Sequence, residues 1–179
     1  MILGGIRLQI TLESERLFLK PLSLNELLNI KNKELGALET AVDIEALDLV
    51  DAAVPKKIEK MKKVYEEVHE WYTYWLIIDK NSHRGIGFIG FKGSPDERGY
   101  SEVGYSISPR YRKRGLMTEA LQTLAEWAQA FRNCKGITAK VLKTNTGSIR
   151  VLEHCNFKRV SSDETDHHYA LNFHVQNSC

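Results

Sequence analysis

Residues 100–141 change their hydrophobic period twice, and this change constrains the fold more than any other feature of the sequence. Apolar residues occupy alternate positions at 100–107, as they do in a β-strand with one face buried. Over 117–131 they recur every three or four positions, which is typical of an amphipathic helix. Alternation returns at 137–141. The segment is therefore predicted to be a strand-helix-strand unit that contains one parallel crossover.

The rest of the chain predicts further strands and helices around this unit. Strands are expected at 15–20, 72–79, 86–91, 157–160 and 169–173, and helices after Ser23, over 54–68 and over 149–155. Three consecutive strands in the middle of the chain favour antiparallel pairing. The expected fold is α/β (α+β), with a mixed, mostly antiparallel sheet of about six to seven strands and helices on both faces.

Composition narrows the class of protein. The chain has 179 residues, of which 42% are hydrophobic and 27% charged, so we expect one domain over residues 1–179 with a core of ordinary size. No stretch is long and apolar enough to predict a membrane span, and the N-terminus does not resemble a signal peptide. The net charge of +2 does not indicate a nucleic-acid or membrane partner.

The cysteines and histidines do not predict a metal site or a disulfide framework. The chain has three cysteines, an odd number, and they are widely spaced: Cys134, Cys155 and Cys179. This pattern fits a reducing cytoplasm. The six histidines, which include His174 and the pair His167-His168, lack the spacing of metal ligands. We therefore expect a cytoplasmic protein without a metal ion, as a monomer or a homodimer.

A basic segment, RYRKR at 110–114, lies between the predicted strand and the predicted helix. It could be a nucleic-acid patch or a localisation signal, a solvated loop, or an anion site. The anion site is favoured because the first N–H groups of a helix have no partner within the helix and attract phosphate. Gly115 would let the backbone approach a pyrophosphate closely, and the basic side chains would add positive charge.

The strand before this segment carries a second signal. Glu102, Gly104 and Ser106 share the face opposite to Val103 and Ile107. These residues could simply face solvent, but the strand is expected to be central in the sheet. A carboxylate followed by two small residues then suggests a groove beside the strand.

Three segments resemble the GNAT acetyltransferase family. The stretch EVGYSISPRYRKRGLMTEAL resembles the motif that surrounds the acetyl-CoA pyrophosphate, and TNTGSIRVLEHCNF resembles the motif that follows it. SERLFLKPLS and FIGF resemble the first and third strands of the family. Among the branches of this family, the motifs most resemble those of the branch containing ribosomal-protein N-terminal alanine and serine acetyltransferases. Residues 36–70 match nothing in the pattern, and in this family that region shapes the acceptor site.

The resemblance implies a fold, a co-substrate and a set of site residues. It implies that acetyl-CoA is the co-substrate and that its pyrophosphate binds the N–H groups of Arg114 to Thr118. The residues implied in cofactor binding are Ser106, Ile107, Arg112, Lys113, Arg114, Gly115, Leu116, Met117, Thr118, Asn145 and Ser148. Asn145 is also a candidate helix N-cap, because asparagine side chains accept hydrogen bonds from the first turn.

This chain departs from the family pattern at four positions. Lys113 stands where glycine is frequent, and Met117 where glycine or alanine is frequent. Asn156 replaces the usual glycine before Phe157, which is a mild change because asparagine tolerates a left-handed helix end. Leu152 stands where many members have the tyrosine that protonates the leaving thiolate, and the resemblance offers Ser148 as the substitute acid.

The resemblance implies direct acetyl transfer to a primary amine, with Glu102, Ser148 and Asn145 as catalytic residues. Glu102 is the candidate base, acting through a water, or else a structural carboxylate paired with a nearby basic residue. The acceptor could be a ribosomal-protein N-terminus, another peptide, a polyamine, an amino acid or an aminoglycoside. A protein that binds acetyl-CoA without catalysis and a nucleic-acid-binding module are the alternatives.

Overall fold

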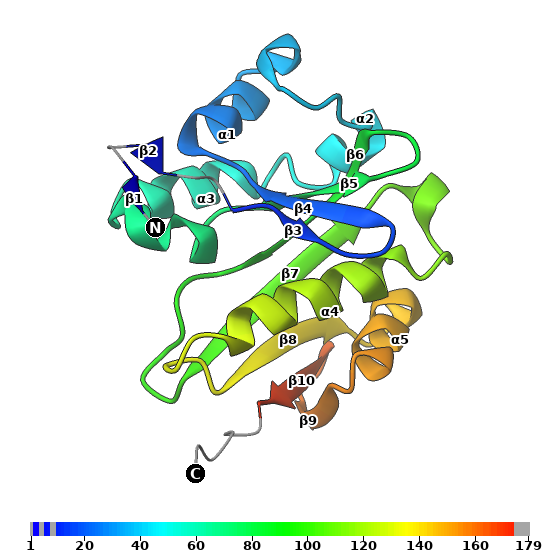
Figure 1. Ribbon diagram of the computed structural model, residues 1–179. Helices are drawn as coiled ribbons and strands as arrows, with labels where there is room; N and C mark the ends of the chain where they lie inside the picture. Colours follow the sequence, from blue (N-terminus) through cyan, green and yellow to red (C-terminus); the bar gives the residue numbers. More distant parts are fainter. Residues whose placement is uncertain (1, 4–5, 8–9, 174–179) are drawn as a thin grey trace.

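An eight-stranded, mostly antiparallel sheet forms the centre of the structure, in the order β3-β4-β5-β6-β7-β8-β10-β9 (Figure 1). Its strands are β3 (Leu12–Glu13), β4 (Leu17–Pro21), β5 (Trp75–Asp79), β6 (Arg84–Phe91), β7 (Tyr100–Ile107), β8 (Gly136–Leu142), β9 (Lys158–Ser162) and β10 (Asp166–Asn172). The computed structural model describes residues 2–3, 6–7 and 10–173, so His174 and Cys179 lie outside the described residues. Apart from this sheet, β1 (Ile2–Leu3) and β2 (Ile6–Arg7) pair antiparallel.

The predicted α/β architecture is confirmed, with one more strand than the expected range. The additional strand is β3, which pairs with β4 after a tight turn. In this turn the N–H of Ser14 donates to the carbonyl of Leu17 at 3.0 Å. The strand predicted at 15–20 therefore begins two residues later, at Leu17, because residues 14–16 form the turn of a hairpin.

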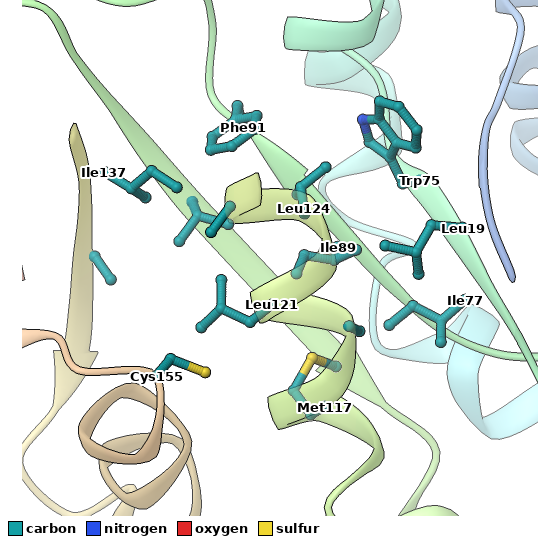
Figure 2. Close-up of a cluster of buried hydrophobic side chains, with 14 of the residues drawn as sticks. Leu19, Trp75, Ile77, Ile89, Phe91, Met117, Leu121, Leu124, Ile137 and Cys155 are labelled. Atoms are coloured by element: carbon teal, nitrogen blue, oxygen red, sulfur yellow. The ribbon is translucent and has the colours of Figure 1, made fainter. Parts of the chain in front are cut away.

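Within the described residues, five α-helices cover the two faces of the sheet: α1 (Leu24–Lys31), α2 (Ile44–Asp48), α3 (Val54–Met61), α4 (Leu116–Gln129) and α5 (Thr146–His154). Strand alternation sorts the core into two clusters. Trp75 and Ile77 pack with Leu121 of α4 (Figure 2), whereas Leu76 and Phe88 pack with α1, α2 and α3. The helices α4 and α5 therefore cover one face, and α1, α2 and α3 cover the other.

The second predicted helix is shorter than its apolar stripe. The helix α3 ends at Met61, and a 3-10 helix follows at Glu66–Trp71. Ile58 is buried in the cluster beneath α1 and α3, whereas Trp71 is buried in the other cluster, against Phe91. A straight helix cannot bury these side chains on opposite faces of one sheet, so the chain leaves the helical path between them.

The strand β7 joins the two parts of the sheet. Its residues Val103 to Ile107 pair antiparallel with Gly87 to Phe91 of β6. It pairs parallel with β8 over three positions only, with Tyr100 opposite Gly136 and Glu102 opposite Thr138. Beyond Glu102 and Thr138 the two strands do not pair with each other, so they separate toward their carboxyl ends and leave a gap in the sheet.

Candidate active site

A cavity of about 360 Å³ lies where β7 and β8 separate. Gly104 and Tyr105 line it from β7 and Val141 from β8, while Asn145 and Ser148 line it from the start of α5. A Cβ atom added at Gly104 would meet nothing within 4 Å. The missing side chain at this position therefore leaves open space in the cavity wall.

The predicted residues of the second motif come together at this cavity. The Oδ1 atom of Asn145 accepts a hydrogen bond from the N–H of Ser148 at 3.1 Å, which confirms Asn145 as the N-cap of α5. This bond uses only the oxygen of its side-chain amide. Leu152, also on the cavity wall, is 1% exposed, and its hydrocarbon side chain can neither donate nor accept a proton.

Tyr105 is a polar residue of the cavity that the sequence pattern did not single out. Its hydroxyl donates to the main-chain carbonyl of Ser148 at 3.1 Å. Burial raises the pKa of this phenol well above its ordinary value, although the hydrogen bond to Ser148 acts in the opposite direction. Nothing in the local sequence predicts the hydrogen-bond partner of Tyr105.

The predicted groove residues of β7 have different environments. Glu102 is partly exposed and forms an ion pair with Lys92, which follows β6 and lines the cavity. The basic partner of Glu102 is therefore Lys92 and not a residue of the segment 110–114. The hydroxyl of Ser106 is buried and has no hydrogen-bond partner within the described part of the chain. Ile107 is buried, and its carbonyl accepts from Nε of Arg112 at 3.3 Å.

The basic loop, which we define as Arg110–Gly115, connects β7 to α4 after the buried Ser108. Two of its residues have left-handed backbone conformations, Lys113 with φ 59° and Gly115 with φ 74°. The helix begins at Leu116 with Gly115 as its N-cap, and no side chain caps it among the residues described. The first N–H groups of α4 therefore remain available to an anion.

The first two side chains of α4 are buried in the core. Leu116 and Met117 are each 6% exposed and belong to the core, and Figure 2 shows Met117 beside Ile77 and Leu121. Little of either side chain is therefore exposed to a ligand at the loop. A methionine at 117 is thus compatible with a site that uses main-chain N–H groups.

The helix α5 ends as expected for an asparagine in place of glycine. Asn156 has a left-handed φ of 63°. Its N–H donates to the carbonyl of Glu153 and that of Phe157 donates to Leu152, the paired bonds of a Schellman helix end. The departure from the family pattern at Asn156 therefore leaves the geometry of this helix intact.

Neither a metal-binding group nor a membrane-spanning helix is found among the described residues. Over residues 2–3, 6–7 and 10–173, no three His, Cys, Asp or Glu side chains are grouped so that they could hold a metal ion. Within the same residues, every helix is too short or too polar to cross a membrane.

Comparisons with known proteins agree with these features. Residues 16–158 match the family model described as the acetyltransferase (GNAT) domain. The uncharacterised N-acetyltransferase YjdG of Bacillus subtilis is 36% identical over 86 residues, which are 48% of this chain and 51% of that protein. The chain spans about half the length of the curated relatives it matches.

Two solved structures share the fold at low sequence identity. The ribosomal-protein-S5-alanine acetyltransferase from Vibrio fischeri is 19% identical, with a TM-score of 0.63 over 91% of this chain and 96% of its own. The microcin C7 self-immunity acetyltransferase MccE, solved in complex with acetyl-CoA and AMP, is 12% identical. Its TM-score is 0.61, over 89% of this chain and 94% of its own.

Proposed function

This chain belongs to the GNAT acetyltransferase family, and from that premise we propose that it transfers an acetyl group from acetyl-CoA to the α-amino group of a peptide or protein. The observation that carries the proposal is the proximity of two sites along β7. Tyr105 lies on the cavity wall, and the basic loop begins only five residues later, at Arg110. A phosphate site and a cavity on one strand suit a ligand that has a pyrophosphate and a long arm.

The residues present fit acetyl-CoA. The N–H groups of Arg114, Gly115, Leu116, Met117 and Thr118 are proposed to bind the pyrophosphate, and Arg112, Lys113 and Arg114 to add positive charge. Beyond the pyrophosphate, we assign the arm to the gap between β7 and β8, along Ser106 and Ile107. In this arrangement Asn145 and Ser148 face it from the start of α5.

When bound, acetyl-CoA supplies a thioester that an amine can attack. The amine must first lose a proton, and Glu102 is the proposed base, acting through a water. The sulfur that leaves must gain a proton, and the Ser148 hydroxyl is the proposed donor. Leu152, at the position where many family members have a tyrosine, cannot serve as this donor.

The ion pairs around the cavity favour an acceptor that loses its proton readily. Glu102 pairs with Lys92, and Asp166 pairs with Lys140 at 3.2 Å. A hydrogen bond from Thr165 lowers the pKa of Asp166, and Lys140 adds to this effect against the opposing effect of burial. A carboxylate whose pKa is lowered, as that of Asp166 is, is a weak base. At pH 7, deprotonating an α-amino group costs about 1 kcal/mol, compared with roughly 4.6 kcal/mol for a lysine side chain.

The first acceptors to test are therefore the N-termini of peptides, including those of ribosomal proteins. A thiol-release assay with acetyl-CoA should compare peptides that begin with alanine or serine with the same peptides carrying a blocked N-terminus and an internal lysine. Release with the free peptides only supports the proposal. Release with polyamines, amino acids or aminoglycosides but with no peptide would contradict the proposed acceptor.

A second candidate is a protein that binds acetyl-CoA without transferring the acetyl group. The observation that favours it is Leu152, which removes the usual acid. Binding of CoA by calorimetry, together with no thiol release from any amine tested, would support this candidate over the enzyme.

A further inference from the structure

Arg16, in the turn between β3 and β4, contacts the basic loop and α4 at the same time. Its Nη1 donates to the carbonyl of Arg114 at 2.9 Å. Its Nε and its main-chain N–H donate to the two carboxylate oxygens of Glu119 at 2.6 and 2.7 Å. The hydroxyl of Ser14 donates to the same carboxylate at 2.7 Å. One turn near the start of the chain is therefore bonded to the loop and to the first turn of α4.

The contact with the Arg114 carbonyl affects the direction in which the N–H groups of the basic loop point. Arg114 lies between Lys113 and Gly115, which have left-handed conformations, while Arg114 itself does not. Successive N–H groups in such an alternation gather on one side of the backbone and form a concave anion site. A peptide carbonyl points opposite to the N–H of the same peptide unit, so the Arg114 carbonyl is turned out of the site, where Arg16 binds it.

The contact with Glu119 affects the charge near the proposed phosphate site. Glu119 lies in the first turn of α4, and an uncompensated carboxylate there would repel a phosphate. Burial alone would raise the pKa of this carboxyl, but hydrogen bonds from Ser14 and Arg16 outweigh burial, so the pKa is below its ordinary value. The carboxylate therefore stays charged near neutral pH, and the guanidinium of Arg16 compensates that charge.

We propose that Arg16 is a positioning residue for CoA binding, which holds the Arg114 carbonyl and the Glu119 carboxylate so that the amides of the basic loop stay directed at phosphate. This inference rests on the proposed function, because it assigns the loop to the pyrophosphate. Arg16 acts through the loop and needs no contact with the ligand. Lysine cannot replace it fully, because an ammonium lacks the planar fork that reaches both acceptors.

The test measures CoA affinity by calorimetry, a melting curve and steady-state kinetics for matched variants. Arg16→Gln should weaken CoA binding about 10-fold and raise the KM for acetyl-CoA, with little change in kcat or in the KM for the acceptor. Arg16→Lys should fall between Arg16→Gln and wild type. Arg16→Gln combined with Glu119→Gln should bind CoA more tightly than Arg16→Gln alone, because the unpaired charge is gone.

The matched control is Lys80→Gln. The Lys80 ammonium pairs with Glu13 at 2.5 Å and donates to the carbonyl of Ser14 at 2.6 Å, so the variant loses side-chain contacts to the same turn. The main-chain N–H of Lys80, which donates to the carbonyl of Arg16, is kept. This variant should keep wild-type CoA affinity. Equal losses of affinity in Lys80→Gln and Arg16→Gln would overturn the proposal, since they would show a general structural effect.

The outcomes separate this inference from the proposed function. A wild-type protein that does not bind CoA overturns the proposed function and the inference with it. A wild-type protein that binds CoA, with Arg16→Gln folded and binding within twofold, overturns the inference alone. If Arg16→Gln does not fold, Arg16→Lys decides, and wild-type affinity in that variant would likewise overturn the inference.

Discussion

The hydroxyl of Tyr105 donates to the main-chain carbonyl of Ser148 at 3.1 Å and so connects β7 to the first turn of α5. Both residues line the cavity, from opposite sides of the gap between the strands. The position of the Ser148 side chain therefore depends on a residue of β7. A bond that holds the two walls together should affect both stability and the geometry of transfer.

Tyr105→Phe removes this hydrogen bond and keeps the ring. We expect the free energy of unfolding to fall by about 1 kcal/mol, as for one buried hydrogen bond, and kcat to fall because Ser148 is less well held. Tyr169→Phe is the control, since the Tyr169 hydroxyl contacts Glu153 of α5 at 3.4 Å and does not line the cavity. Urea unfolding and initial rates at saturating substrates measure both effects. An unchanged kcat in Tyr105→Phe would show that the bond does not position the acid.

Ser148→Ala tests the proposed proton donor directly. The bond from Tyr105 survives in this variant, because its acceptor is the main-chain carbonyl. We expect kcat to fall by about 10- to 1000-fold with little change in CoA affinity, as for the loss of one acid or oriented hydrogen bond. A kcat within twofold of wild type would mean that the thiolate takes its proton from another group or from solvent.

Glu102→Gln tests the proposed base, and Lys92→Gln is its matched control. Both variants break the same ion pair, but only the first removes the carboxylate. If Glu102 accepts the amine proton, kcat/KM of Glu102→Gln should fall most at low pH and recover partly as the pH approaches the pKa of the acceptor. Lys92→Gln should keep the wild-type profile between about pH 6 and 9.5. Parallel profiles for all three proteins, with lower melting temperatures in both variants, would assign Glu102 a structural role.

Lys113→Gly tests the backbone of the basic loop. Lys113 has a φ of 59°, a region that costs a residue with a Cβ atom about 1 kcal/mol and costs glycine little. Lys113→Ala is the control, because it removes the same charge and keeps the Cβ atom. The glycine variant should be about 1 kcal/mol more stable than the alanine variant in urea unfolding. Equal stabilities would indicate that the loop relaxes out of this conformation.

The buried Lys57 should make the free energy of unfolding depend on pH. It is 8% exposed, and its ammonium donates to the carbonyls of Phe91 and Thr73. Burial lowers its pKa from 10.5 to about 7, and the nearby charges of Lys60 and Lys92 add to this effect. Between these two pH values the unfolded chain binds more protons than the folded chain at this residue, so its contribution to stability rises with pH.

Lys57→Met should remove this rise. The lost hydrogen bonds lower stability at every pH, so they change the level of the curve but not its slope. Urea unfolding from about pH 6 to 10 should show a steeper increase for wild type than for Lys57→Met. Lys56→Met, which replaces an exposed neighbour, should keep the wild-type slope. Equal slopes for wild type and Lys57→Met would mean that Lys57 remains charged in the folded protein.

Periodicity located the elements that carry the site, because those elements are regular and half buried. The strand β7 matches its predicted range, and α4 begins one residue earlier than predicted. The pairing of Glu102 with Lys92 could not be predicted in the same way. It depends on the register of β6 against β7, and the loop between these strands does not set that register in any pattern visible in the sequence.

Contacts between distant segments could not be predicted from the sequence either. Arg16 and Glu119 are 103 positions apart, and only the stacking of the β3-β4 turn on α4 brings them together. The helix α2 was missed because a five-residue helix is too short for a helical period to emerge. The N-cap role of Asn145 was accessible, since capping depends on residues three positions apart.

The three-residue pairing of β7 with β8 also affects which part of the structure is expected to unfold locally. It leaves two units of the sheet, β3 to β7 and β8 with β10 and β9, which are joined by few ladder hydrogen bonds and by the packing of α4 and α5 (Figure 1). We therefore expect the second unit to open below the free energy of global unfolding and its amides to exchange with solvent before those of β5 and β6. An arm of a ligand that lies between β7 and β8 would link the units and slow that exchange. Binding in the gap and local unfolding of the second unit would then be linked equilibria.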